Sequence, residues 1–199
     1  MSHSKAYDYF NKLSPQTKDL ITATTDNEFN EAFDRWLNEA LIYLEKSKKN
    51  LQPLGEDGLS DVLVGTLNTP EISVTREQFS NGHVDITVKI IAASPHRVKL
   101  GEAKKWDGNK YHIKGLDQLL NRYTVGREDR GFVISYVKLK DIKGLFEKLR
   151  EYIDESKPFA LEGKCKDNGI RWSFLSAHKH NSGELIEICH VGCNLFIEA

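Results

Sequence analysis

The chain has 199 residues, of which 39% are hydrophobic and 29% charged, and its formal net charge is −1. This length fits one domain of ordinary size, and the charge balance lacks the basic excess typical of proteins that coat nucleic acid. The longest apolar runs are far too short to cross a bilayer, and residues 1–30 lack the apolar stretch of a secretory signal. A cytoplasmic protein with no membrane partner is therefore expected.

Two helices are predicted near the N-terminus, over residues 27–50 and 56–67. The first has apolar residues at three- and four-residue spacing, and Asp26 or Asn27 is its expected cap. Its apolar stripe contains Phe29, Phe33, Trp36, Leu37, Ala40, Leu41 and Leu44. Residues 1–50 are expected to form a helical extension.

Three strands are predicted next, over residues 72–79, 84–91 and 97–105. The second alternates, which places Val84, Ile86, Val88 and Ile90 on one face and Asp85 on the polar face.

The remaining elements alternate between helix and strand. The strand over 97–105, a helix over 113–124 and a strand over 131–137 that is apolar on both faces predict a right-handed parallel crossover. A further helix over 142–153, capped by Asp141, is predicted next. Strand candidates at 170–178 and 184–189 follow. The order predicts a single α/β domain, a sandwich with a central mixed sheet flanked by helices, with a core over 51–156 and a C-terminal hairpin extension over 157–199.

The chain has three cysteines, Cys165, Cys189 and Cys193, and an odd number argues against a disulfide framework. With His178, His180 and His190 nearby, one interpretation is a zinc site. Because the spacing matches no established zinc pattern, ordinary buried thiols are the favoured interpretation.

Chemistry is expected where the strand over 97–105 ends. Glu102 and Lys104 are two apart, so they share a face, and Asp85 converges on them if its strand pairs antiparallel. Two carboxylates that converge inside a fold repel each other unless a cation neutralises them. With the backbone carbonyl of Ala103 they suit Mg²⁺ or Mn²⁺. Lys104 would then position or deprotonate a water, or stabilise negative charge on a phosphate.

This arrangement resembles the PD-(D/E)XK nuclease superfamily, in a branch found in restriction-like and bacterial defence nucleases. The resemblance spans residues 56–137 and rests on GHVDI at 82–86, GEAKKWDG at 101–108, GLDQLLNRY at 115–123 and FVISY at 132–136. The residue before Asp85 is Val84, whereas the motif that names the superfamily has proline at that position. The resemblance implies a restriction-endonuclease-like fold, with Asp85 and Glu102 as metal ligands and Lys104 as the catalytic lysine. It also implies that Gln118 orients near the site or touches the phosphate backbone, and that the preceding helix supplies a further acidic ligand.

For that acidic ligand, Glu56 is favoured over Asp57, because the helical period places Glu56 on the sheet-facing side. The alternative is that Glu56 is only a favourable first-turn acid. Glu77 is a further candidate to reach the metal, with a cross-strand ion pair to Arg76 as its alternative.

Basic residues near the proposed site predict a nucleic-acid surface. Those nominated are Lys105, Lys110, Lys114 and Arg122, with Arg127 and Arg130 further along, and their alternative is a solvated charged face. The expected activity is a DNA endonuclease in bacterial defence. A homodimer through the helix at 27–50 and a partner protein of a defence system are also expected. The alternatives are a ribonuclease or toxin-like effector, an idle nucleic-acid-binding or assembly subunit, or a structural ion-pair network.

Overall fold

The computed structural model describes residues 3–76, 78–79, 83–92 and 97–198. Seven strands form one sheet in the order β1-β4-β5-β6-β9-β8-β7. Neighbours β5, β6 and β9 are parallel and the other pairs are antiparallel, which confirms an α/β protein with a mixed sheet. The strands are β1 (Ile72–Thr75), β4 (Ile86–Ile90), β5 (Arg97–Lys105), β6 (Arg130–Val137), β7 (Lys166–Asp167), β8 (Ser173–Lys179) and β9 (Leu185–Asn194), and a separate ribbon holds β2 (Gln78–Phe79) and β3 (His83–Val84).

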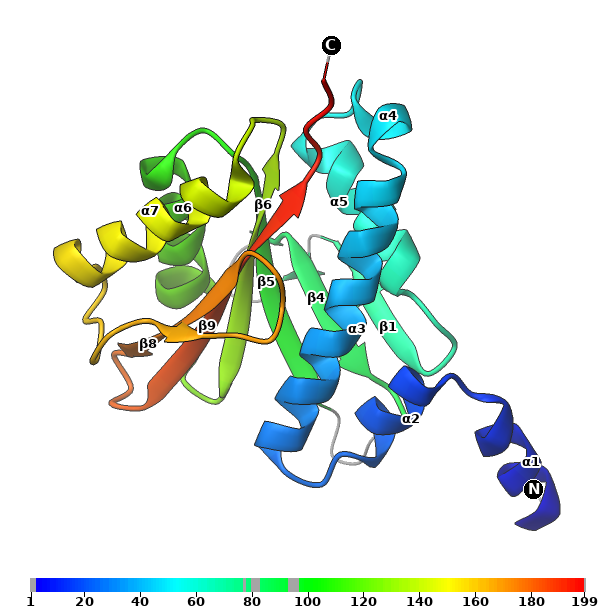
Figure 1. Cartoon of the computed structure of the whole chain (residues 1–199). Coiled ribbons are helices and arrows are strands. Elements are labelled where there is room, and N and C mark those ends of the chain that lie inside the picture. Colours follow the sequence, from blue (N-terminus) through cyan, green and yellow to red (C-terminus); the bar gives the residue numbers. More distant parts are fainter. Residues whose placement is uncertain (1–2, 77, 80–82, 93–96, 199) are drawn as a thin grey trace.

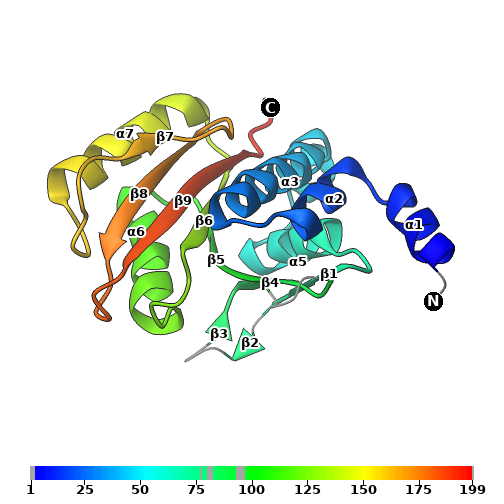
Figure 2. The same ribbon diagram turned by 90° about the horizontal axis from the view of Figure 1, so that it is seen from below.

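Helices cover both faces of this sheet (Figures 1 and 2). On one face lie α3 (Asp26–Lys46) and α5 (Glu56–Leu67); on the other lie α6 (Asn109–Gln118), its π-helical continuation η1 (Leu119–Tyr123) and α7 (Ile142–Ser156). Short helices α2 (Pro15–Thr22) and α4 (Lys48–Leu51) flank α3, and α1 (His3–Lys12) lies farthest from the sheet. Among the described residues, no helix is long and apolar enough to cross a membrane.

The helix α3 packs its apolar stripe into the protein's own core. Phe33 lies against Phe132 of β6, with ring centroids 5.3 Å apart, and Leu37 and Leu44 are fully buried. Its cap is Thr25, which forms a reciprocal capping box with Glu28, so the expectation of Asp26 or Asn27 was wrong. Because the stripe is covered by the sheet, it does not supply the dimer interface for which it was nominated.

The strand predicted over 84–91 breaks at Asp85. Ile86, Val88 and Ile90 share one face as expected, and they pack on the α3 and α5 side, but Val84 packs with Leu100 on the α6 side. The single-face alternation was therefore wrong for Val84, because the break lets the chain cross to the other side of the sheet.

The C-terminal hairpin is part of the main sheet, because β9 pairs with β6 on one side and with β8 on the other. The strand β8 begins at Ser173, later than predicted, since Trp172 has a left-handed backbone with φ of 53°. All three cysteines are buried and free, in line with the interpretation as thiols.

A chain of hydrogen bonds crosses the α6 side of the sheet in the interior. It runs from Ser135 to His112 (2.7 Å), to His190 (2.8 Å), to Ser176 (2.7 Å) and to His178 (2.7 Å), and it ends at the carbonyl of Phe159 (3.1 Å). The three histidines and two serines are each at most 1% exposed. Of the histidines considered for a zinc site, His178 and His190 are linked through the Ser176 hydroxyl in this chain, and His180 bonds instead to the Ser182 hydroxyl at 2.9 Å.

Candidate active site

Asp85 and Glu102 meet at the end of the β4–β5 pairing. The last paired residues are Ile86 and Gly101, so Asp85 stands beside Glu102 where β4 leaves the sheet. The Asp85 carboxylate accepts a hydrogen bond from the backbone N–H of Ala103 at 3.1 Å. A side chain thus bonds to the β5 backbone where the neighbouring strand has ended.

Glu102 is a buried carboxylate with few polar neighbours. It is 0% exposed, and neither carboxylate oxygen has a hydrogen-bond partner of good geometry among the described residues. Burial and the nearby charge of Asp85 raise the pKa of Glu102 from 4.5 to about 8, although Lys104 acts in the opposite direction. This carboxyl group is therefore poised to keep a proton or to accept a cation.

Lys104 lies among three carboxylates. Its Nζ is 2.9 Å from Glu102 Oε2, 3.3 Å from Asp85 Oδ2 and 3.7 Å from Glu56 Oε1. Burial alone would lower the pKa of Lys104, but Glu102 and the other carboxylates outweigh it and raise the pKa above its ordinary value. Its aliphatic stem passes beneath α6 at Gly115, where a Cβ would come within 3.2 Å of Lys104 Cγ.

Glu56 reaches this cluster from the first turn of α5. Its Oε2 accepts the backbone N–H of Lys105 at 2.6 Å. Asp57 points elsewhere and pairs with Arg76 at 2.8 Å, as the helical period predicted. We call Glu56, Asp85, Glu102 and Lys104 the carboxylate–lysine cluster.

The cluster offers the donor type that Mg²⁺ or Mn²⁺ prefers, because carboxylates are hard oxygen ligands. The Glu102 oxygens are buried and accept no well-aligned hydrogen bond among the described residues, although Lys104 Nζ lies 2.9 Å from one of them, and a bound cation would compensate them. Within the described residues, however, no group of three or more His, Cys, Asp or Glu side chains is arranged to hold a metal ion. The Lys104 ammonium lies between the carboxylates, so metal binding requires that side chain to move aside. The carbonyl of Ala103 stays a predicted ligand.

Tyr123 also belongs to this neighbourhood, which the sequence did not reveal. Burial raises the pKa of its phenol, and the charges of Glu102 and Asp85 raise it further. In the sequence Tyr123 was one member of an apolar helical stripe, so its pattern indicated core packing. Only the fold places its hydroxyl near the carboxylates.

Gln118 is the last residue of α6 and is half-buried. Among the described residues, no hydrogen bond joins it to the carboxylate–lysine cluster. Glu77, nominated as a possible ligand, lies outside the described residues.

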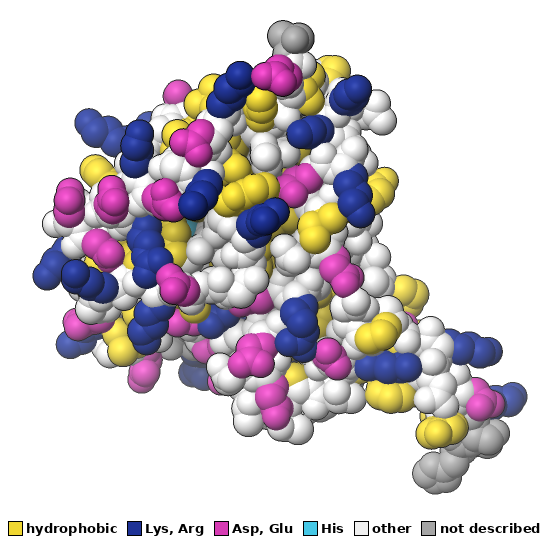
Figure 3. Space-filling view, in the orientation of Figure 1, with side chains coloured by type: hydrophobic (Ala, Val, Ile, Leu, Met, Phe, Trp, Pro, Cys, Tyr) yellow, Lys and Arg dark blue, Asp and Glu magenta, His cyan; other side chains and the backbone are white. Residues whose placement is uncertain are grey.

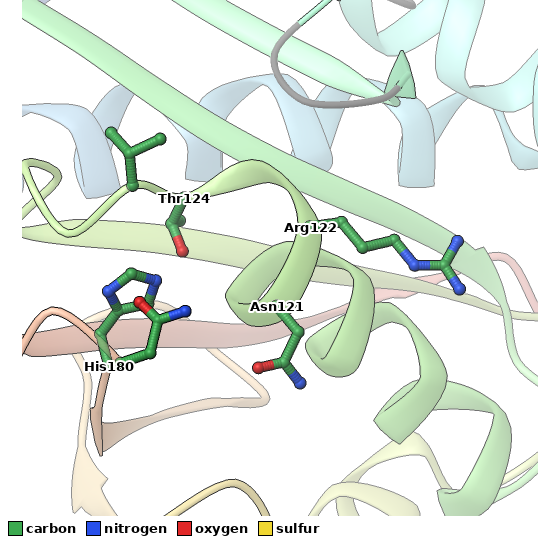
Figure 4. Close-up of a pocket in the computed structure, with 6 residues that line it drawn as sticks. Asn121, Arg122, Thr124 and His180 are labelled. Carbon is green, nitrogen blue, oxygen red and sulfur yellow. The ribbon is translucent and has the colours of Figure 1, made fainter.

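The predicted nucleic-acid residues are distributed around the site. The side chains of Lys105, Lys110 and Lys114 are exposed, the first at the end of β5 and the others on α6. Arg122 is also exposed and lines a polar pocket of about 470 Å³. Its guanidinium extends away from His180, another residue that lines this pocket (Figure 4). Arg130 is buried and pairs with Asp34 at 2.9 Å and with Glu187, so it was wrongly nominated for a phosphate-contacting surface.

Comparisons with known proteins identify no relative: no family model, no curated protein and no solved structure matches this chain.

Proposed function

We propose that this chain is a metal-dependent nuclease that hydrolyses phosphodiester bonds, with a restriction-endonuclease-like fold and DNA as its preferred substrate. The observation that carries the proposal is the convergence of Asp85, Glu102, Lys104 and Glu56 at the point where β4 leaves β5. A role in bacterial defence, a homodimer and a partner protein are parts of the same proposal.

The charge of the cluster supports a cation. If all three carboxyl groups are ionised, including the fully buried Glu102, they exceed the one ammonium group by two negative charges. A divalent cation held by Asp85 and Glu102 would neutralise this excess, and it would supply Lewis-acid activation of a phosphate or of a water.

Lys104 is suited to stabilise charge. Because its pKa is raised, the side chain is an ammonium at neutral pH, and an ammonium has no lone pair with which to take a proton from water. Among the roles considered for Lys104, stabilising negative charge on a phosphate is therefore favoured. Glu56 holds the Lys105 backbone and so fixes the end of β5 that carries Lys104.

Cleavage assays test the proposal. Plasmid, linear duplex, single-stranded DNA and RNA are incubated with Mg²⁺ or Mn²⁺, and wild type is compared with Asp85→Asn and Lys104→Ala. Lys89→Ala serves as the matched control, because Lys89 is an exposed lysine on β4. We expect metal-dependent cutting that the two cluster variants lose and the control keeps. Cutting that survives in both cluster variants would contradict the assigned site.

A second candidate is a structural ion-pair network in a binding or assembly protein. It is favoured by one observation, that Lys104 already occupies the centre of the carboxylates. Thermal unfolding with and without Ca²⁺ separates the two, since a cation that binds the folded state raises the midpoint. A rise that Asp85→Asn abolishes supports the metal site, and an unchanged midpoint supports the ion-pair network.

A further inference from the structure

A groove of about 420 Å³ lies between α7 and the start of β8, away from the carboxylate–lysine cluster. We call it the α7–β8 groove. Its volume falls in the range of pockets that hold small ligands or single nucleotides. It is lined by Lys143, Phe146, Glu147, Arg150, Arg171, Trp172, Ser173 and Phe174.

The apolar part of the groove is aromatic and rigid. The rings of Phe146 and Phe174 are 6.4 Å apart, and Phe174 in turn stacks on buried His190 at 4.6 Å. Trp172 is half-buried at the groove, with the Arg171 guanidinium 5.6 Å from its ring centroid. Phe146 and Phe174 are buried, so Trp172 is the aromatic side chain of the groove that is open to a ligand, and the Arg171 guanidinium lies over one face of its ring. The other face of the indole suits a flat ring as its ligand.

The backbone of Trp172 is held in an unfavourable conformation. Its φ of 53° is left-handed, a region that costs a bulky residue free energy unless the surroundings impose it. Two hydrogen bonds fix the segment: Gly192 N donates to the Trp172 carbonyl at 3.0 Å, and Ser173 Oγ donates to the Ile170 carbonyl at 2.5 Å. The strain presents the indole at the groove at the point where β8 begins.

The charged part of the groove favours anions. Three cations line it, Lys143, Arg150 and Arg171; Lys143 Nζ lies 3.7 Å from Glu147 Oε1 and Arg150 pairs with Asp167, which leaves one positive charge in excess among these groups. Arg150 is held in place by Asp167 and by the Cys165 carbonyl. Figure 3 shows basic, acidic and hydrophobic side chains close together on this face, over α7 and the neighbouring strands.

The groove lies on the same row of the sheet as Lys104. Lys104 pairs with Ser135, Ser135 pairs with Gly192, and Gly192 bonds to Trp172. Three strand spacings separate Lys104 from Trp172, or about 15 Å. This row is a backbone path through the sheet, and it runs beneath α7, since a Cβ on Gly192 would meet Phe146 and Ile142.

We propose that the α7–β8 groove binds a base of single-stranded nucleic acid, stacked on Trp172, with the adjacent phosphate held by Arg171 and Lys143. An aromatic platform beside cations is the combination that single-strand-binding proteins use. In the proposed nuclease, this groove would be a contact for a single strand outside the carboxylate–lysine cluster. Only this use of the groove rests on the proposed function. Binding itself requires neither a metal nor cleavage.

The test measures binding of a fluorescently labelled short oligothymidylate by anisotropy, in EDTA so that no cleavage occurs. Trp172→Gly removes the ring while tolerating the positive φ, and we expect it to weaken binding by about 5- to 150-fold. Trp172→Phe keeps an aromatic face and should retain most of the affinity. Arg171→Ala should weaken binding and lower the slope of log affinity against log salt by about 0.7. Lys164→Ala, an exposed lysine outside the groove, is the matched charge control.

Two results would overturn the inference: an unchanged affinity in Trp172→Gly, or equal binding of an oligoglutamate peptide. Asp85→Asn separates this test from the proposed catalysis, because it should lose cutting yet bind the oligonucleotide as wild type does. Binding that depends on Trp172 in a protein that cuts nothing would support the groove and contradict the nuclease. Cutting by a protein whose binding does not depend on Trp172 would support the nuclease and contradict the groove.

Discussion

Asp85 binds the backbone N–H of Ala103 and raises the pKa of its neighbour Glu102, so one carboxylate affects both the geometry and the charge of the site. The hydrogen bond holds the chain at the point where β4 ends. The charge makes it harder for Glu102 to ionise.

Two substitutions separate these effects. Asp85→Asn keeps an oxygen that accepts the Ala103 N–H but removes the charge, whereas Asp85→Ala removes both. We expect Asp85→Ala to lose about 1–3 kcal/mol of unfolding free energy, the cost of an unpaired buried donor, and Asp85→Asn to lose less. Urea unfolding in EDTA measures both. Equal destabilisation by the two variants would show that the hydrogen bond does not matter.

Glu102 should make the metal-free protein less stable as pH rises. Its folded pKa is raised from 4.5 to about 8, so between these values the folded protein holds a proton that the unfolded chain releases. The free energy of unfolding therefore falls with increasing pH through this window, by at most about 1.4 kcal/mol per pH unit. Glu102→Gln has no such proton and should be more stable than wild type near pH 9. Urea unfolding of both proteins in EDTA, near pH 5 and near pH 9, provides the check; a wild type as stable as Glu102→Gln near pH 9 would count against the buried carboxyl.

Much of the fold follows from local patterns. The helix α5 has the predicted bounds because its apolar spacing and its first-turn acids are local signals. The same helical period correctly predicted that Glu56 faces the sheet, where it bonds to β5, and that Asp57 faces away, where it pairs with Arg76. The buried strand β6 was recognised because both of its faces are apolar.

The missing parts depend on contacts that are distant in sequence. Val84 changed sides because the strand breaks at Asp85, whose side chain then bonds to β5, and no two-residue alternation contains that information. The central position of Lys104 also depends on three elements meeting, α5, the β3–β4 junction and β5. Sequence spacing nominated these residues, but it did not predict that the ammonium would lie between the carboxylates.

Position 101, next to Glu102, is a glycine because the ring of Phe132 leaves no room there for a side chain. A Cβ at this position would lie 2.2 Å from the ring of Phe132, which is itself packed against Phe33. We expect Gly101→Ala to cost about 1–3 kcal/mol, as overpacked cores do, and to reduce cleavage by displacing β5. Gly65→Ala is the control, because a Cβ there meets nothing within 4 Å. Urea unfolding compares the two; a Gly101→Ala protein of wild-type stability would show that Phe132 has another position available.

With all three histidines neutral, as their burial favours, the buried chain has only one arrangement of protons that satisfies every bond. The Phe159 carbonyl can only accept, so His178 carries its proton on Nδ1 and accepts from Ser176. Ser176 then accepts from Nε2 of His190, and His190 accepts from Nε2 of His112. The last donor is the Ser135 hydroxyl, to His112 Nδ1. All three histidines are neutral in this arrangement.

This chain predicts a loss of stability in acid. Burial lowers the pKa of His112 to about 3 and lowers the pKa values of His190 and His178, and Trp106, Phe146 and Phe174 supply only aromatic surroundings. Above the unfolded pKa of 6.5 the histidines are neutral in both states and have no effect. Below it the unfolded chain takes up protons that the folded protein refuses, so the free energy of unfolding falls as pH decreases, by up to about 1.4 kcal/mol per pH unit for each histidine.

Nitrogen chemical shifts test the assignment directly. At about pH 6 we expect His178 in the Nδ1–H form and both His112 and His190 in the Nε2–H form, with no imidazolium among them. Ser135→Ala removes the terminal donor and leaves His112 Nδ1 without a partner, which should cost about 1–3 kcal/mol at neutral pH. His180→Gln, at the β8–β9 turn and outside the chain, is the matched control and should leave the acid dependence of urea unfolding as in wild type. His178 in the Nε2–H form would contradict the order of donors, because its bare Nδ1 would then face the Phe159 carbonyl, an acceptor against an acceptor. A protonated ring among the three at about pH 6 would contradict the lowered pKa values of the histidines.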